Sequence, residues 1–320
     1  MSKFRFHDEM TTRRSKRVVS PRSRAQLLAA VIGALCVILA SGCGSSGSSS
    51  SSSGALPAAQ VQPPPSIASS KKLVVCSDEV EPPFAYRNGE ELTGSEVEIM
   101  NEVGKLLGVH TEYSQIGFDG LFAALRAGKC DAAIDEIADT PEREKTITDV
   151  DYMNIGQTFM VKAGNPLHLT SFESLCGHTV GAVLASVDIE YLHELSKQCT
   201  SKGKAPVHIE GFNDDPTGAE ALITSKIDAF QEDTPLLNGL IARSHGQIVL
   251  SSQQPIKQIP CGIAVALNNT ALATAIQKAL NKLYANGQIQ SIFTKFNEGP
   301  VGLAGSEPAS VNAATQGGKT

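Results

Sequence analysis

One short stretch of the sequence brings together residue types that bind anions. An apolar run at 132–134, typical of a buried strand, leads into Asp135-Glu136 and then into Thr140-Pro141-Glu142-Arg143. Pro141 suits the first position of a helix, which predicts that Arg143 lies in the first turn of that helix. Free backbone N–H groups at a helix start and a guanidinium both bind carboxylates. We therefore expect this turn to hold the carboxylate of a small ligand, an amino acid.

Three further polar residues come just after apolar runs that are typical of strands. They are Asp78, Ser186 and Asp233. Ligands of α/β proteins bind beyond the carboxyl ends of parallel strands and in clefts between lobes. We therefore expect these side chains to lie near Arg143. A simpler explanation stays open for Ser186 and Asp233, because both are also good N-caps for the helices predicted after them.

The elements that must position these residues alternate between strand and helix patterns. One alternating series covers residues 73–137, and a second covers residues 179–251. Two more helices are predicted at 271–285 and 289–296. This alternation predicts an α/β fold in which helices cover parallel strands.

Two extended segments, near 155–162 and 256–264, join the two series. Two chain crossings between two lobes form a hinge with a cleft between the lobes. We therefore predict lobe 1 at 71–157 and 259–297 and lobe 2 at 158–258, with the ligand between them.

The first 42 residues have the features of a secretory signal peptide. Six basic residues between positions 13 and 24 precede an apolar run at Leu27–Leu39, and small residues then precede Cys43. The apolar run is short for a membrane span, although an uncleaved anchor helix is the alternative. The small residues and Cys43 resemble a bacterial lipobox. This predicts export and a lipid on Cys43 that anchors the chain to the outer face of the cell membrane.

Both flanks of the globular part have compositions that do not build a core. Residues 43–70 are rich in Ser and Gly and then in Pro, which predicts a flexible tether. Residues 298–320 are rich in Gly, Ala and Ser, and we expect a disordered tail. The part between them is long enough for two lobes.

Charge and motif content exclude several classes of function. Without residues 1–42 the chain has 19 basic and 31 acidic side chains, a net charge of −12, which argues against binding nucleic acid or an anionic lipid surface. The six histidines of that part are scattered without paired spacing, so we expect no metal site. No P-loop, nucleophile elbow or Gly-rich dinucleotide loop occurs in the sequence, so we expect no cofactor.

The five cysteines of the globular part suit a protein outside the cytoplasm, where cysteines can pair. Cys176 and Cys199 flank one predicted strand–helix unit and are the best pair. Cys76 and Cys130 lie in or beside predicted strands that could be neighbours, which leaves Cys261 unpaired. Other pairings stay open, because a sequence alone does not fix connectivity.

Several short motifs occur in an order and spacing that resemble the extracytoplasmic solute-binding proteins of family 3, the amino-acid receptors of ABC importers. The motifs are Ser77-Asp78, Pro82-Pro83-Phe84, Gly94–Ile99, Phe118–Leu121, Asp131–Ala133, Thr140–Arg143, Gly156-Gln157 and Asp233–Pro235. The similarity runs from Leu73 to Asn297, and the surroundings of Cys176 and Cys199 look like the actinobacterial branch. The resemblance implies a two-lobe periplasmic-binding-protein fold of type II and an ABC permease as partner. We expect a monomer.

The resemblance also implies roles for single residues. Arg143 matches the residue that binds the α-carboxylate of the ligand, and Ser186 assists it. Asp233 matches the acid that binds the α-ammonium. Phe118 matches an aromatic wall against the ligand side chain, with an ordinary core position as the alternative. Asp78 matches a polar group near the opening of the first strand.

The sequence departs from the family pattern at several positions. Glu81 stands where many members have Tyr or Phe, and Asp135-Glu136 replaces small residues. Ala138 replaces a Ser or Thr that helps to hold the carboxylate, and Ala185 stands where Gly is frequent. The added acids predict a ligand with a cationic side chain, such as arginine, lysine or ornithine. The alternative is that these acids face solvent or pair with basic residues, which leaves a generic polar amino-acid site.

Three functions are compatible with this pattern. The first is a receptor that captures an amino acid and presents it to an importer. We expect this function because Arg143 and Asp233 can bind the two charged ends of an amino acid, and no reaction is needed to explain them. The second is an enzyme of the same fold, similar to cyclohexadienyl dehydratases, with Glu81 or Glu136 as general acid. The third is a sensor that reports the ligand to another membrane protein.

Overall fold

The computed structural model describes residues 56–251, 257–298 and 309–315. All described residues belong to one compact unit within residues 53–320. The predicted signal peptide and the predicted lipid site Cys43 lie outside the described residues.

A nine-stranded sheet forms the centre of the described unit. Its strands are β1 (Lys72–Ser77), β5 (His110–Gln115), β6 (Ala132–Ala138), β7 (Ile147–Lys162), β8 (Thr179–Val183), β9 (His208–Phe212), β10 (Ala229–Asp233), β11 (Ile248–Leu250) and β12 (Lys257–Ala266). The path is β5-β1-β6-β12-β7-β10-β8-β9, and β11 pairs with β7. β1 pairs in parallel with β5 and β6, and β8 pairs in parallel with β9 and β10, which confirms the predicted α/β fold.

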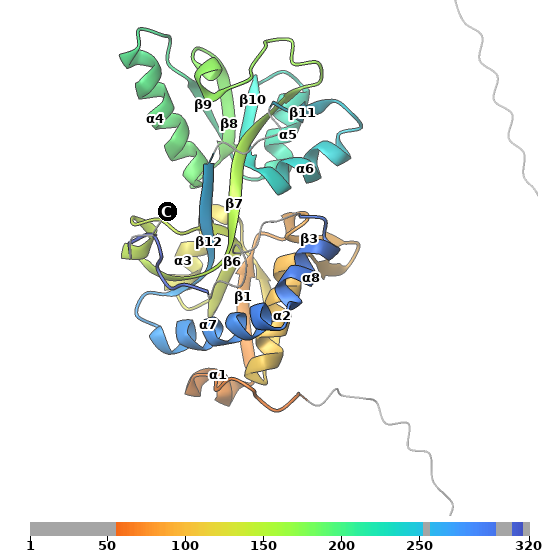
Figure 1. Cartoon of the computed structure of the whole chain (residues 1–320), viewed down its shortest axis with the longest axis vertical. Coiled ribbons are helices and arrows are strands. Elements are labelled where there is room, and N and C mark those ends of the chain that lie inside the picture. The colour runs from red at the N-terminus through yellow and green to blue at the C-terminus, as the bar shows by residue number, and fades with distance from the viewer. Residues whose placement is uncertain (1–55, 252–256, 299–308, 316–320) are drawn as a thin grey trace, which may run out of the picture. The chain divides into compact units, whose positions relative to one another are not determined.

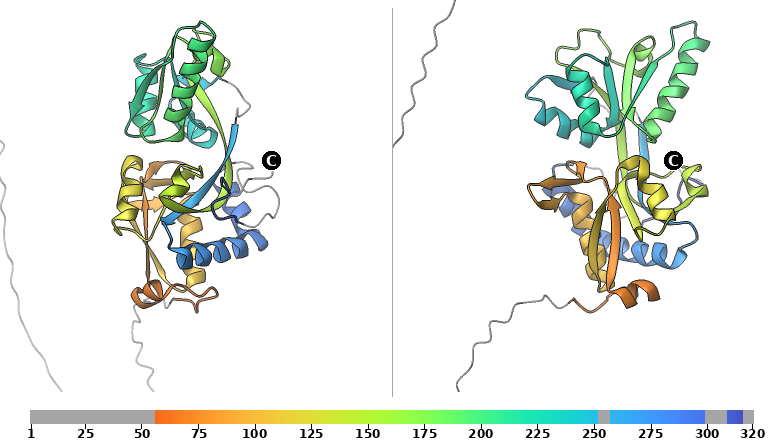
Figure 2. Two further views of the ribbon diagram at one scale, coloured as in Figure 1. Left: turned by 90° about the vertical axis from the view of Figure 1, so that its left-hand side faces the viewer. Right: turned by 180° about the vertical axis from the view of Figure 1, so that it is seen from behind.

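Helices cover the sheet, and a small sheet of β2 (Val80–Glu81), β3 (Ala85–Asn88) and β4 (Glu91–Thr93) lies beside it. The helices are α1 (Pro65–Ser70), α2 (Ser95–Leu107), α3 (Phe118–Arg126), α4 (Val187–Ser201), α5 (Asp215–Ile223), α6 (Thr234–Arg243), α7 (Thr270–Ala285) and α8 (Gln288–Lys295), with short 3₁₀ turns at Arg143–Lys145 and Phe172–Leu175. Figures 1 and 2 show α1–α3, α7 and α8 around one half of the sheet and α4–α6 around the other.

The segments predicted as extended crossings are parts of two long strands. β7 pairs with β12 in antiparallel register from Ile147 opposite Ala266 to Gln157 opposite Lys257. Beyond this point β7 continues and pairs with β10 and β11 instead. One continuous sheet therefore runs through both halves of the unit, and β7 and β12 are the strands that connect them (Figure 1).

Apolar spacing explains how the helices attach to the sheet. In α2 the side chains at helical spacing, among them Ile99, Met100 and Leu107, are fully buried. The helix ends at Gly108, whose positive φ of 69° suits glycine. Together with α7 and α8, α2 covers one core, and a separate buried cluster packs around α3 and α5.

The prediction of a flexible tether up to residue 70 is wrong for its last part. Val61 and Ile67 are buried, and the N–H of Val61 donates to the carbonyl of Leu106 at 2.9 Å. Pro65 opens the helix α1, for which its fixed φ is well suited. Two isolated apolar residues and backbone hydrogen bonds to Leu106 thus attach this segment to the unit.

The prediction of a disordered tail over 298–320 is also wrong for residues 309–315. These residues lie against the unit, where Ala309 is buried and Val311 forms an antiparallel bridge with Val150 of β7. Residues 147–156 of β7 pair with β12 on one side only, so their other edge can accept a further strand. Composition alone does not reveal such an edge.

Two disulfides connect neighbouring elements in the described residues. Cys176 is bonded to Cys199, as predicted, and Cys76 is bonded to Cys130, while Cys261 is free and buried. Among the described helices, none has the length and the apolar character that a membrane span requires.

Candidate functional site

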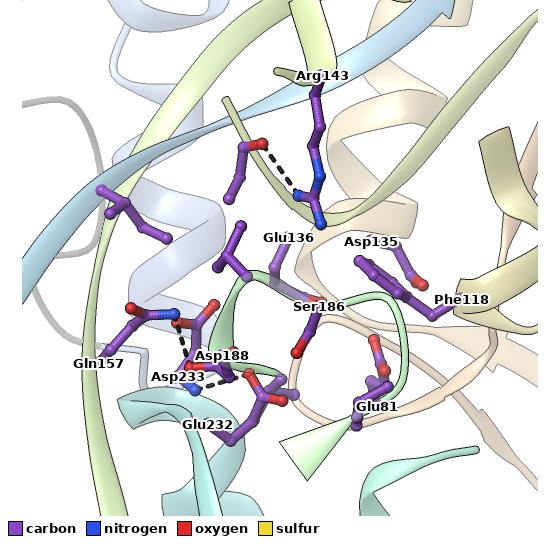
Figure 3. Close-up of a pocket in the computed structure, with 15 residues that line it drawn as sticks. Glu81, Phe118, Asp135, Glu136, Arg143, Gln157, Ser186, Asp188, Glu232 and Asp233 are labelled. Carbon is purple, nitrogen blue, oxygen red and sulfur yellow. Dashed lines mark hydrogen bonds between the residues drawn. The ribbon is translucent and has the colours of Figure 1, made fainter. Parts of the chain in front are cut away.

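A pocket lies where the end of β6 and the Arg143 turn face the start of α4 and the end of β10 (Figure 3). It holds about 380 Å³ of space, part of it open to solvent. The residues that line it are Glu81, Phe118, Asp135, Glu136, Ala138, Arg143, Gln157, Val183, Ser186, Val187, Asp188, Glu232, Asp233, Leu236 and Ile259.

The structure brings together seven of the eight residues predicted to bind a ligand. Glu81, Phe118, Glu136, Ala138, Arg143, Ser186 and Asp233 all line the pocket. Asp78 is the exception, because it is not part of the lining. Its backbone N–H instead donates to Oδ1 of Asp135 at 3.1 Å, so Asp78 supports a lining residue. Whether the seven bind a ligand stays a prediction.

Arg143 lies in a single 3₁₀ turn, not in the helix that Pro141 predicts. The turn is short because Thr146, Ile147 and Thr148 follow directly, and β-branched residues favour the extended strand β7 that begins there. Despite this correction, the turn still directs the guanidinium of Arg143 into the pocket (Figure 3).

The guanidinium of Arg143 contacts both sides of the pocket. Its Nη1 donates to the carbonyl of Ala138 at 3.0 Å, and its Nη2 donates to the carbonyl of Ala185 at 3.1 Å. The guanidinium carbon lies 5.6 Å from the ring centre of Phe118 and 5.2 Å from that of Phe122, within range of cation–π attraction. Burial lowers the pKa of Arg143, and nearby carboxylates oppose this shift. A guanidinium has five N–H donors, so donors remain for a ligand.

Ala185 has an unusual backbone conformation at this contact. Its φ is 64°, in the left-handed region that favours glycine, and the sequence resemblance places glycine there in many family members. The strained conformation places the Ala185 carbonyl within reach of Arg143.

The first group of acids in the pocket is Glu81, Asp135 and Glu136. All three are buried, and each offers an oxygen within 4.8 Å of the other two. Oδ1 of Asp135 accepts a hydrogen bond from the Ser77 hydroxyl at 3.2 Å. One oxygen each of Glu81, Asp135 and Glu136 is buried without a hydrogen-bond partner. Burial, followed by repulsion from neighbouring carboxylates, raises the pKa of all three well above the ordinary values.

The second group of acids is Asp188, Glu232 and Asp233, on the opposite side of the pocket (Figure 3). Oδ1 of Asp188 accepts hydrogen bonds from the side-chain amides of Gln157 at 2.9 Å and Gln231 at 2.7 Å. Burial raises the pKa of Asp188 to about 6, although the Gln231 amide opposes this shift. Burial and the neighbouring carboxylates raise the pKa of Glu232 and Asp233 well above the ordinary values.

Ser186 and Asp233 occupy the N-cap positions of α4 and α6, as their sequence context predicts, but neither side chain caps its helix. The Ser186 hydroxyl and Oδ1 of Asp233 are buried without a hydrogen-bond partner. Buried polar groups without partners are costly, so this pair is arranged for something other than helix capping. Phe118 lines the pocket and also belongs to the core around α3, which fits both of its proposed roles.

Sequence reasoning missed several lining residues. Asp188 lies in the first turn of α4, two positions after Ser186, and Glu232 directly precedes Asp233. Gln157 belongs to a motif that suggested the family but had no role assigned to it. Asp188 and Glu232 could have been found from the sequence, because they lie within two positions of the predicted site residues Ser186 and Asp233. No pattern in the sequence singles out Gln157, because only the register of β7 opposite β10 places it beside Asp233.

The pocket thus contains six carboxyl groups and one guanidinium among the lining residues. Burial is the main cause that raises the pKa values of these groups, and repulsion between neighbouring carboxylates adds to it for most of them, so ionising all six requires a compensating charge. An added cation would allow them to ionise. The arrangement suits a ligand that has one carboxylate and more than one positive group.

Comparison with known proteins places this pocket in context. The family described as bacterial extracellular solute-binding proteins, family 3, matches residues 73–299. The L-cystine-binding protein TcyJ of Escherichia coli K12 is 26% identical over 226 residues, covering 70% of this chain and 82% of that protein.

Solved structures give the same result for the fold. An ancestral arginine-binding protein bound to arginine superposes with a TM-score of 0.65 at 27% identity, covering 71% of this chain and 98% of the other. An ancestral amino-acid-binding protein, AncCDT-1, described as a precursor of cyclohexadienyl dehydratase, has a TM-score of 0.65 at 23% identity and covers 72% and 97%. The periplasmic-binding-protein fold predicted from the sequence is confirmed.

Proposed function

Because the chain belongs to family 3 of the bacterial extracellular solute-binding proteins, we propose that it captures an amino acid with a cationic side chain and delivers it to an ABC importer. The observation that carries this proposal is the composition of the pocket, with six carboxyl groups around one guanidinium. The arginine bound to an ancestral protein of this fold supports it.

The two groups of acids suggest how such a ligand would lie. The carboxylate would pair with the free donors of Arg143, in the two-bond geometry that guanidinium groups favour. The α-ammonium would contact Asp233 and Asp188, and the Ser186 hydroxyl supplies an additional acceptor. The cationic end of the side chain would reach the group of Glu81, Asp135 and Glu136, which bring one carboxylate oxygen each within 4.8 Å of one another. Each of these acids also has one buried oxygen without a hydrogen-bond partner. Apolar stem atoms would pack against Phe118.

Electrostatics explains why a second positive group matters. A buried acid pays a large desolvation cost unless a cation or hydrogen bonds compensate it. A ligand with an uncharged side chain would leave Glu81, Asp135 and Glu136 uncompensated. A dibasic amino acid would neutralise both groups of acids at once, and the selectivity of the pocket would follow from that difference.

We further propose that the ligand bridges two lobes, residues 71–157 with 259–297 and residues 158–258, and that the lobes close by bending β7 and β12. The bond between Arg143 and the Ala185 carbonyl crosses this boundary and supports the assignment. Residues 1–42 would act as a signal peptide, and a lipid on Cys43 would anchor a monomer to the outer face of the cell membrane. The ABC permease is the proposed partner.

A second candidate function rests on one observation. Glu81 and Glu136 are buried carboxyl groups with raised pKa values inside the pocket, and such groups can act as general acids. The likeness to AncCDT-1 supports the fold of such an enzyme only. We favour the receptor, because the acids of the pocket balance the charges of an amino acid without requiring a reaction.

The test is a thermal-shift and calorimetric comparison of the unit 53–320 with L-arginine, L-lysine, L-ornithine, L-cystine, L-glutamine and L-glutamate. A ligand at 100 times its Kd stabilises the folded protein by about 2.7 kcal/mol. We expect the three dibasic amino acids to raise the melting temperature and L-glutamate to have no effect. A response to L-glutamine equal to that of L-arginine would refute the cationic preference, and no response to any amino acid would refute the receptor.

Two variants connect the result to the pocket. Arg143→Lys keeps the charge but removes the two-bond geometry, so it should weaken L-arginine binding by about 100-fold. Arg126→Lys makes the same change at an exposed position in α3 and should have no effect. Incubation with the best ligand should leave its mass unchanged, whereas a dehydrated or decarboxylated product would favour the enzyme.

A further inference from the structure

The C-terminal residues 309–315, here called the C-terminal strap, bind to the free edge of β7. Val311 forms an antiparallel bridge with Val150. The N–H of Asn312 donates to the carbonyl of Asp149 at 3.1 Å, and its side-chain oxygen accepts from the N–H of Asp149 at 2.8 Å. These three contacts, made by two consecutive strap residues, fix the register of the strap on the strand.

The strap also contacts α7. The N–H of Ala309 donates to Oδ1 of Asn281 at 2.7 Å, and the side chain of Gln277 donates to the carbonyl of Ala309 at 2.9 Å. Ala309 itself is 2% exposed. Side-chain amides one helical turn apart thus hold both backbone groups of this alanine, which anchors the start of the strap.

The end of the strap contacts the turn that holds Arg143. The N–H of Ala314 donates to Oδ2 of Asp139, and the N–H of Thr315 donates to Oε1 of Glu144, both at 3.0 Å. Asp139 directly follows β6, and Glu144 directly follows Arg143 in sequence. The strap therefore connects both ends of the turn 139–144 to the sheet.

These contacts involve a second cluster of buried acids, outside the pocket lining. It consists of Asp139, Glu144, Asp149 and Asp151, all less than 9% exposed. Burial and the neighbouring carboxylates raise the pKa of Asp139 to about 6 and that of Asp151 to about 8, and N–H groups of the strap oppose both shifts. The strap thus supplies donors to acids that otherwise repel one another across the base of the turn.

We propose that the C-terminal strap is a positioning element of the ligand site, which holds the turn 139–144 so that Arg143 is directed into the pocket. The role of the strap in ligand binding rests on the receptor function proposed above. The docking of the strap on β7 and α7 does not depend on that function. Arg143 lies in a single 3₁₀ turn between β6 and β7, in which its N–H donates to the Thr140 hydroxyl at 3.2 Å, and the strap holds the next residue, Glu144. Loosening the base of the turn would therefore reach the guanidinium directly.

The test compares two truncations of the full chain. Removal of residues 309–320 deletes the strap, and removal of residues 316–320 leaves it intact. Hydrogen exchange at the amides of residues 139–151 and calorimetry with L-arginine are measured for both. We expect strap removal to speed exchange at these amides and to weaken L-arginine binding, each by at least about tenfold. The shorter truncation should match the full chain in both measurements.

Point variants separate positioning from general stability. Asn312→Ala removes the side-chain bond to β7 and should give a smaller change in the same direction, whereas Asn286→Ala, at the end of α7, should give none. A synthetic peptide of residues 307–317 added to the truncated chain should restore L-arginine binding.

Each alternative outcome has a clear meaning. Unchanged exchange after removal of 309–320 would overturn the docking of the strap. Faster exchange with unchanged L-arginine affinity would overturn its positioning role. If the full chain binds no amino acid, the proposed receptor function fails, and the exchange comparison, which needs no ligand, still decides whether the strap holds the turn.

Discussion

Two helix starts at the pocket differ from two helix starts elsewhere in the described unit. Asp214 caps α5, where its side chain accepts from the N–H of Thr217 at 2.8 Å, and Asn269 caps α7 in the same way. Ser186 and Asp233 hold the equivalent positions of α4 and α6 but make no such bond. The same residue types thus stabilise a helix away from the pocket and leave their oxygens unpaired inside it.

This difference has a thermodynamic meaning. A capping bond contributes about 1 kcal/mol to stability, and two helices forgo it at the place where a ligand is proposed to bind. The unpaired oxygens cost stability in the empty protein and become available to the α-ammonium of a ligand. Substitutions at the two kinds of helix start should therefore affect different properties.

The largest expected effect is that of Asp233→Asn. The variant preserves shape but removes the charge proposed to bind the α-ammonium, so L-arginine affinity should fall by about 100-fold. The stability of the empty protein should be unchanged or higher, because a buried acid is removed. Calorimetry and thermal unfolding measure the two properties separately. An affinity within about threefold of wild type would show that Asp233 is only a helix-start residue.

A pH series should give the next largest effect. Burial raises the pKa of Asp188 from 3.8 to about 6, and those of Glu232 and Asp233 rise as well, so the empty pocket takes up protons. A cation requires the ionised forms. L-arginine affinity should therefore increase by about tenfold between pH 5 and pH 7, with release of protons. Equal affinities across this range would contradict the assignment of these acids.

The same proton uptake determines how the empty protein responds to pH. The folded-state pKa of Asp188 lies above its ordinary value of 3.8, so its contribution to stability is fully present below that value. The contribution is lost as the pH rises through about 6. Melting temperatures of the ligand-free protein should therefore fall from pH 4 to pH 7, and saturating L-arginine should reduce this slope.

Asp214→Ala tests the other side of the comparison. It removes a real cap and should lower the free energy of unfolding by about 1 kcal/mol. L-arginine affinity should remain at the wild-type value, because Asp214 does not line the pocket. Chemical denaturation and calorimetry check both statements. A large loss of affinity here would remove the distinction between the two kinds of helix start.

Ser186→Ala should have the smallest effect. The hydroxyl makes no capping bond, so stability should stay within about 0.5 kcal/mol of wild type. Loss of one neutral acceptor from the pocket should weaken L-arginine binding by about threefold to tenfold. A drop in stability comparable to that of Asp214→Ala would indicate that Ser186 caps α4 in solution.

The fold and the centre of the site could be predicted because they depend on local pattern. Apolar spacing indicated the parallel sheet, and Arg143 followed a buried strand next to a polar turn. Asp188 was missed although it follows Ser186 by two positions, at the start of α4. Gln157 was missed because its place beside Asp233 depends on which strands pair and in what register. Register is a property of the assembled sheet, and the sequence around Gln157 does not contain it.

The C-terminal strap could not be predicted for a different reason. Residues 309–315 are mostly small, and they belong to a tail rich in Gly, Ala and Ser whose composition predicts disorder. They bind because β7 presents a free edge and α7 presents Gln277 and Asn281 to the strap backbone. The partner surface, and not the segment itself, determines this part of the structure.

The Ala185 carbonyl, which accepts a bond from Arg143, has a consequence for the release of a solute. A carboxylate that arrives at the guanidinium finds free donors, while the Ala138 and Ala185 carbonyls already occupy two others. These two backbone carbonyls can therefore hold the guanidinium both before the solute arrives and after it leaves. A carrier that must surrender its cargo at a membrane gains from this arrangement, since the vacated guanidinium still has a partner and unloading leaves no buried cation alone.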